Sequence, residues 1–244
     1  MINQIRKIQK MTQKINKNSI EFNNNLPITI TVLEEMCNQQ YKLLIGKRKL
    51  IAKSKKKLKP KSEYWGDLIE TREGSISITS MFAKPETFNL NMAFMDVEKD
   101  SFLQSLMTLE NPLQAIKKSI IKKLAASETT KEEFLTLSYI LLAYEKNIFH
   151  LPASIENKKI LIQFQKNIEK NIEFYLAFEN LGPIKGIITS YKDKTIIDIS
   201  VMFKKSYEYI KKALKELDSN INFSINTNIK PLFNSSELLL DIKG

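Results

Sequence analysis

The chain contains one cysteine and one histidine, Cys37 and His150, and these two residues could supply a nucleophile and its base. A thiol and an imidazole act together only when the fold brings them within hydrogen-bonding distance. No local motif pairs them, and a lone cysteine is more often a small buried apolar residue than a nucleophile. His150 follows a helical pattern and precedes Leu151 and Pro152, which predicts a helix-end position and no catalytic role.

No other set of residues has the spacing of an active site. The single cysteine excludes an intramolecular disulfide and a multi-cysteine metal site. The carboxylates are scattered along the chain, and the sequence has neither a glycine-rich phosphate-binding loop nor a metal-ligand spacing. We therefore predict a non-enzymatic protein that needs no metal and no cofactor.

A run of basic residues is the densest charge cluster in the chain, and it contains no acid. Its members are Lys47, Arg48, Lys49, Lys53, Lys55, Lys56, Lys57, Lys59 and Lys61. Cations that follow phosphates, with Tyr64 and Trp65 beside them to stack on bases, would suit single-stranded nucleic acid. A lysine-rich hairpin edge also protects a sheet from aggregation, so this alternative stays open.

The formal net charge of +11 over 244 residues does not choose a partner. A basic chain attracts nucleic acid, anionic lipid and acidic proteins alike. The heavy use of Asn, Lys and Ile is typical of an AT-rich genome, which accounts for much of the excess. No apolar run is long enough to span a bilayer, and the first 25 residues lack an apolar secretory core. These features predict a cytoplasmic protein, although export by a dedicated secretion system needs no such signal.

The elements that would position these residues fall into four segments of an α+β fold. Residues 1–27 read as an amphipathic helix and a polar linker, because Ile2, Ile5, Ile8, Met11 and Ile15 form one stripe. Residues 28–85 contain short strands with close turns, which favours a small barrel-like region. Residues 86–150 read as helical. A capping box at 130–133 begins a strongly apolar helix, which we expect to lie between the two β regions.

Residues 151–244 give the clearest pattern. Alternating apolar residues predict strands at 160–164, 172–178, 184–191, 195–203 and 221–225. A helix with Ser206 as its N-cap is predicted over 206–217, and residues 235–244 are an edge strand or a tail. The order of the elements predicts a ββαβ domain with one helix on a mostly antiparallel sheet.

Glu179, Asn180, Leu181 and Gly182 connect two of these strands. The C-terminal domain of flagellar hook-length control proteins has a short acidic segment ending in Leu-Gly. A strand, a turn, a strand, a long amphipathic helix and a final strand follow it. Residues 151–244 resemble that domain, because Glu179 and Leu181-Gly182 precede the same order of elements. Phe178 stands where the family usually has proline.

The resemblance implies protein recognition and no bond-making chemistry. In the family, this domain is thought to contact the switch component of the type III export gate, so the resemblance implies an accessory of hook assembly or export. Glu179 to Gly182 would be the partner-binding segment, and export by the flagellar secretion system would be open to the chain. Ruler members have a long extended segment upstream. Here that region reads as folded, so the chain looks like a short relative without a ruler.

Overall fold

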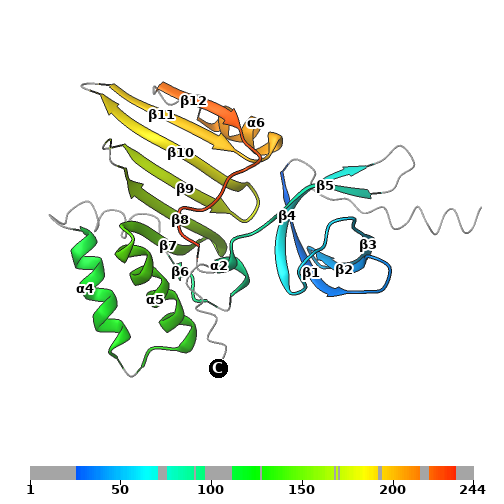
Figure 1. Ribbon diagram of the computed structural model, residues 1–244, viewed down its shortest axis with the longest axis horizontal. Coiled ribbons are helices and arrows are strands. Elements are labelled where there is room, and N and C mark those ends of the chain that lie inside the picture. The colour runs from blue at the N-terminus through cyan, green and yellow to red at the C-terminus, as the bar shows by residue number, and fades with distance from the viewer. Residues whose placement is uncertain are drawn as a thin grey trace, which may run out of the picture.

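The computed structural model describes residues 26–70, 76–90, 92–96, 112–126, 128–167, 169, 171–191, 194–214 and 220–234. It contains two β-sheets with helices packed around the second one (Figure 1), which confirms the predicted α+β class. The predicted N-terminal helix, the linker at 17–25 and the segment 235–244 lie outside the described residues.

The first sheet has five antiparallel strands in the order β3-β2-β1-β4-β5. The strands are β1 (Ile28–Glu35), β2 (Gln40–Ile45), β3 (Arg48–Lys53), β4 (Ser62–Glu70) and β5 (Ile76–Ala83). Alternation along β1 buries Ile30 and Val32, and every strand of the sheet adds residues to one apolar cluster. β3 and β5 lie at the two edges of the described sheet.

The second sheet has seven strands in the order β12-β11-β10-β9-β8-β7-β6. They are β6 (Met95–Asp96), β7 (Ile148–Ile155), β8 (Lys158–Lys166), β9 (Ile172–Phe178), β10 (Gly182–Tyr191), β11 (Lys194–Val201) and β12 (Asn220–Ile225). All neighbours are antiparallel except the pairs β6–β7 and β11–β12. The five strands predicted over 160–225 all belong to this sheet, and β6 and β7 extend it.

Four helices are described: α2 (Glu86–Asn89), α4 (Pro112–Leu124), α5 (Lys131–Glu145) and α6 (Lys204–Ala213). The predicted capping box is confirmed, because the Thr130 side chain and the Glu133 carboxylate each accept a backbone N–H from the other residue. The expectation that this helix lies between the β regions is wrong. α5 packs on β7 and α4, away from the first sheet (Figure 1), and Phe134 is 53% exposed.

Two further predictions are corrected near residues 150 and 206. His150 does not end a helix, because it lies in the middle of β7. The predicted boundary between segments 86–150 and 151–244 therefore falls inside a strand, and both segments contribute to one sheet. Ser206 is not the N-cap of α6. The helix begins at Lys204, and the buried Ser206 hydroxyl donates to the carbonyl of Leu181 at 2.7 Å.

His150 belongs to a buried polar cluster that holds the segment 226–234 across one face of the second sheet. The Gln163 amide nitrogen donates to the Phe233 carbonyl at 2.9 Å, and its oxygen accepts the N–H groups of Leu232 and Phe233. The same Gln163 nitrogen lies 3.0 Å from His150 Nδ1. Because the amide nitrogen can only donate, Nδ1 must accept, which assigns the neutral imidazole proton to Nε2.

Burial makes this histidine sensitive to acid. It lowers the pKa of His150 from 6.5 to about 3, and the described residues give Nε2 no hydrogen-bond partner. In the unfolded chain, His150 binds a proton as the pH falls below 6.5. In the folded chain, it stays neutral until the pH approaches 3. The stability that this residue contributes is therefore complete above pH 6.5 and falls as the pH drops toward 3.

We expect the free energy of unfolding to fall by about 2 kcal/mol between pH 7 and pH 5 because of this one group. His150→Asn keeps an acceptor near the position of Nδ1 but cannot titrate, so it should remove most of this loss even if it is less stable at pH 7. Urea unfolding followed by circular dichroism at the two pH values measures both quantities. Equal losses in the wild type and the variant would contradict the assignment.

Candidate protein-binding site

The turn between β9 and β10 contains the four residues that the sequence singled out. Glu179, Asn180 and Leu181 form the turn, and Gly182 begins β10 with a φ of +76°. A Cβ atom at this glycine would lie 2.6 Å from the ring of Phe203, which is itself buried. Both the left-handed backbone conformation and the lack of space for a Cβ atom therefore favour glycine at position 182.

The backbone of this turn is bound by the first sheet. The Trp65 indole N–H donates to the carbonyls of Phe178 and Glu179, at 2.9 Å and 3.1 Å. The Thr29 hydroxyl also donates to the Glu179 carbonyl, at 3.2 Å. Strands β4 and β1 thus satisfy acceptors in the β9–β10 turn, so the turn is a joint between the two sheets.

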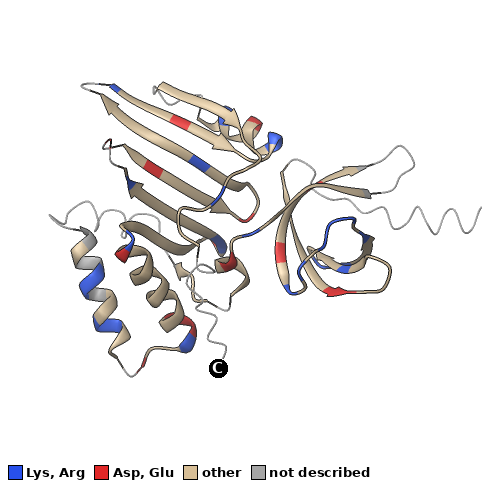
Figure 2. Ribbon diagram, viewed as in Figure 1, with Lys and Arg blue, Asp and Glu red and all other residues tan. Residues whose placement is uncertain are grey.

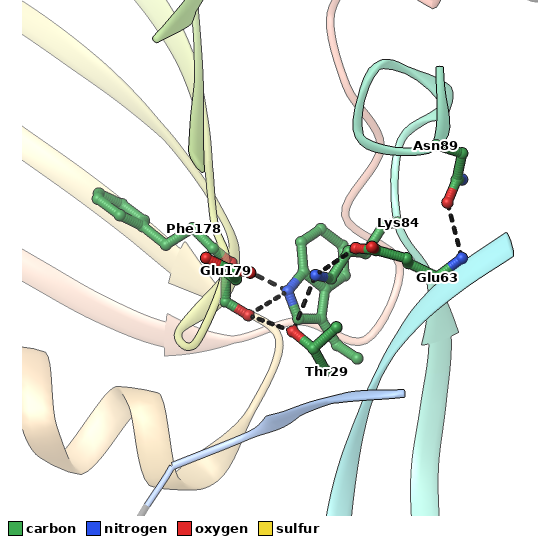
Figure 3. A network of polar contacts seen from close by, with 7 residues as sticks. Thr29, Glu63, Lys84, Asn89, Phe178 and Glu179 are labelled. Atoms are coloured by element: carbon green, nitrogen blue, oxygen red, sulfur yellow. Dashed lines mark hydrogen bonds and ion pairs between the residues drawn. The ribbon is translucent and has the colours of Figure 1, made fainter. Parts of the chain in front are cut away.

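A buried lysine extends this joint, as Figure 3 shows. Lys84, whose side chain is fully buried, donates to the Thr29 hydroxyl and to the Glu63 carboxylate, each at 2.9 Å. Burial lowers the pKa of Lys84, and the attraction of Glu63 opposes that shift. Asn89 of α2 accepts the backbone N–H of Glu63 at 2.7 Å. The network therefore fixes β1, β4, α2 and the turn relative to one another.

An apolar cluster fills the space around these polar contacts. Trp65 and Phe88 from the first half of the chain pack with Tyr175 of β9 and with Phe203, which immediately precedes α6, and Ile229 of segment 226–234 completes the cluster. α6 adds an ion pair, because Lys205 Nζ lies 3.8 Å from the Asp67 carboxylate. A shared core of this kind holds the two sheets as one unit.

The side chains of the turn face a pocket of about 280 Å³ on the outer surface. Ile155, Ile160 and Phe178 give it an apolar lining, and Tyr209 of α6, which is 55% exposed, stands at its side. Glu179, Asn180 and Leu181 all line it, together with Lys158 at the start of β8. The pocket combines an apolar floor with a polar rim, an arrangement typical of a site for a partner's side chain.

The nine basic residues lie elsewhere, on the β2–β3 turn, β3 and the loop that leads to β4 (Figure 2). All nine are exposed. Among the described residues, Lys59 has an ion-pair partner, Glu86 at 3.7 Å. None of the nine lines the pocket beside the turn, so the structure keeps the two predicted sets apart.

The two aromatic residues expected to stack on bases beside the basic run are buried. Tyr64 is 9% exposed and packs in the core of the first sheet, while Trp65 is 1% exposed and packs in the joint. Neither ring can stack on a base, so that part of the prediction is wrong. Adjacent residues of a strand point to opposite faces, and two consecutive large aromatics were the available signal that β4 is buried on both sides.

The cysteine and the histidine are also separated. Cys37 is exposed in the turn that follows β1, contrary to the expectation of a buried residue, whereas His150 is 1% exposed in the second sheet. Within the described ranges, no group of three or more His, Cys, Asp or Glu residues could hold a metal ion. None of the helices described is long and apolar enough to cross a membrane.

Comparison with known proteins identifies no relative, since no family model, curated protein or solved structure matches the chain. The resemblance to hook-length control proteins therefore remains a prediction from the residues. Sequence reasoning gave Trp65 a different role and missed Thr29 and Lys84; all three bind the turn or support it from positions far away in the chain.

Trp65→Phe tests the joint. The substitution retains an aromatic ring but removes the indole N–H that donates to the Phe178 and Glu179 carbonyls, so we expect a loss of about 2–4 kcal/mol in the free energy of unfolding. Phe88→Leu trims the same cluster without removing a hydrogen bond and should cost about 1 kcal/mol. Chemical unfolding followed by circular dichroism compares the two. Similar losses would show that the indole N–H contributes little.

Gly182→Ala tests the second constraint on the turn, and Gly46→Ala is its matched control. Both glycines have a left-handed φ, +76° and +58°, but an added Cβ meets nothing within 4 Å at Gly46. Each variant carries the backbone cost of about 1–2 kcal/mol. The clash with Phe203 should add about 1–3 kcal/mol at Gly182 alone. Equal unfolding midpoints for the two variants would exclude the clash.

Proposed function

We propose that this chain is a non-enzymatic protein-binding accessory of flagellar hook assembly or type III export. The support is the order of elements that the resemblance requires. Glu179 to Gly182 is followed by β10, β11, α6 and β12. The observation that carries the proposal is the pocket of about 280 Å³ lined by Glu179, Asn180 and Leu181, the residues to which the resemblance assigns recognition.

Recognition at this pocket would use side chains. The carbonyls of Phe178, Glu179 and Leu181 already accept hydrogen bonds from within the chain, which favours recognition through side chains. The apolar lining would take an aliphatic or aromatic side chain, and Tyr209 would pack against it. Asn180, which is exposed, would supply directional hydrogen bonds at the rim.

We place the role in recognition and not in length measurement. A ruler needs an extended segment, whereas β1 to β5 here form a folded sheet fixed to the second sheet through Trp65. Two finer features of the fold belong to the same proposal. The first sheet would act as a barrel-like unit, since all five strands share one core, and β10-β11-α6-β12 would be a ββαβ unit.

Nucleic-acid binding by the basic run is the weaker alternative. The exposed cations favour contact with phosphates, which would give an affinity that falls steeply with salt. The burial of Tyr64 and Trp65 removes the base stacking that supplies much of single-strand affinity. Protein recognition therefore has the stronger support.

The direct test is binding of the whole chain to the cytoplasmic domain of the flagellar export-gate switch component, measured by calorimetry. Asn180→Arg places a bulky charge at the rim, and Leu181→Ala removes an apolar contact. Both should weaken binding at least about tenfold if the pocket is the contact. Asn228→Arg introduces the same charge at an exposed asparagine outside the pocket and should leave affinity within about twofold.

Gly182→Ala is unsuitable for this purpose, because the clash with Phe203 disturbs the fold itself. Circular dichroism should therefore establish that each variant used is folded. Undiminished binding by folded Asn180→Arg and Leu181→Ala proteins would reject the pocket, and no binding by the wild-type chain would reject the assignment to the export gate.

A further inference from the structure

A groove separates the two edge strands of the first sheet. Its volume is about 600 Å³. Leu50 and Ala52 of β3 form one side, Ile78 and Met81 of β5 form the other, and β2 contributes the floor. Among the described strands, β3 pairs with β2 alone and β5 pairs with β4 alone. The groove therefore has an apolar lining and an unpaired strand edge on each side.

Unpaired strand edges can receive an additional strand. Each edge presents a row of backbone N–H and C=O groups, and an extended segment satisfies them by continuing the ladder. Alternate side chains of that segment would then point into the apolar groove, and the others would point outward. β3 has six residues and β5 has eight, so either edge is long enough to pair with a short peptide.

The charge beside the groove selects an acidic occupant. Lys53 lines the groove itself, and Arg48 and Lys49 are exposed on the same strand. The following loop continues the positive surface, and it is held in place at Leu58, which is 5% exposed. The Lys59 N–H donates to the Tyr64 hydroxyl at 2.8 Å. The cations of this loop therefore extend from a fixed backbone.

The lining favours a peptide over a nucleic acid. Bases bind single-strand sites by stacking on exposed aromatic rings. The rings near this groove, Tyr41 and Tyr64, are 2% and 9% exposed, and the groove walls are aliphatic. Ile51 of β3 also lines the groove, is 62% exposed and offers an apolar contact to an added strand. Aliphatic walls, strand edges and cations together match an extended chain with alternating apolar and acidic residues.

We propose that the groove between β3 and β5 binds an acidic, extended segment of a protein partner by strand addition. This site is distinct from the pocket beside Glu179, since the two share no lining residue. The ligand class is a peptide with aliphatic residues at alternate positions and carboxylates between them.

The probe is an end-capped eight-residue peptide of alternating valine and glutamate, titrated into the full chain by calorimetry. We expect one peptide to bind per chain, with an affinity that falls as salt rises. The same peptide with lysine in place of glutamate should not bind. N-methylation of alternate amides blocks strand pairing and leaves the charge unchanged, so it should weaken binding at least about tenfold.

Charge reversal on β3 tests the location. The triple variant Arg48→Glu, Lys49→Glu and Lys53→Glu should weaken binding at least about tenfold. A matched variant reverses three exposed lysines on α4 and α5, with the same change in net charge. Its substitutions are Lys118→Glu, Lys122→Glu and Lys131→Glu, and it should stay within about twofold of the wild type.

Four outcomes would overturn the proposal. Absence of binding to the full chain is the first. Equal affinity for the N-methylated and the unmethylated peptide would show that binding depends on charge attraction and not on strand pairing. Tighter binding of a twelve-nucleotide thymidine oligomer that displaces the peptide would assign the surface to nucleic acid. Binding only to a chain that ends at Asn234 would show that residues 235–244 occupy the groove themselves.

Discussion

The docking of the Trp65 indole onto the β9–β10 turn is the interaction on which the rest of the structure depends. One N–H satisfies two backbone carbonyls, and the ring fills the center of the cluster shared by both sheets. A buried carbonyl without a donor costs free energy, so this contact ties the conformation of the turn to the presence of β4. Glu179, Asn180 and Leu181 line the pocket beside this turn, whose backbone is held by the first sheet.

Two other buried polar side chains also hold distant segments of the chain together. Lys84 reaches the turn through Thr29, and Gln163 binds the backbone of segment 226–234 with both ends of its amide. That segment brings Ile229 into the shared cluster. These buried contacts favour one arrangement, because any other would leave the Lys84 charge or the Gln163 amide without its partners. The relative position of the two sheets is thus specified by polar contacts as well as by apolar area.

We propose two surfaces of this unit as binding sites for partners. One is the pocket beside the turn, where an apolar lining meets an exposed asparagine and tyrosine. The other is the groove in the first sheet, where strand edges meet a fixed basic loop. They lie on different sheets of one unit, so a single chain could hold two partners at a set spacing.

The sequence by itself determined the local elements, because they follow from short-range periodicity. Alternation predicted the strand 172–178 with the bounds of β9, and Thr130 with Glu133 predicted the start of α5. Contacts between residues far apart in the chain could not be predicted from the sequence. Nothing near Ser206 indicates that its hydroxyl serves Leu181, and nothing near His150 indicates that it pairs with Gln163 in a strand. The tertiary structure decided these roles, since hydrogen-bond partners of buried groups depend on which segments the fold brings together.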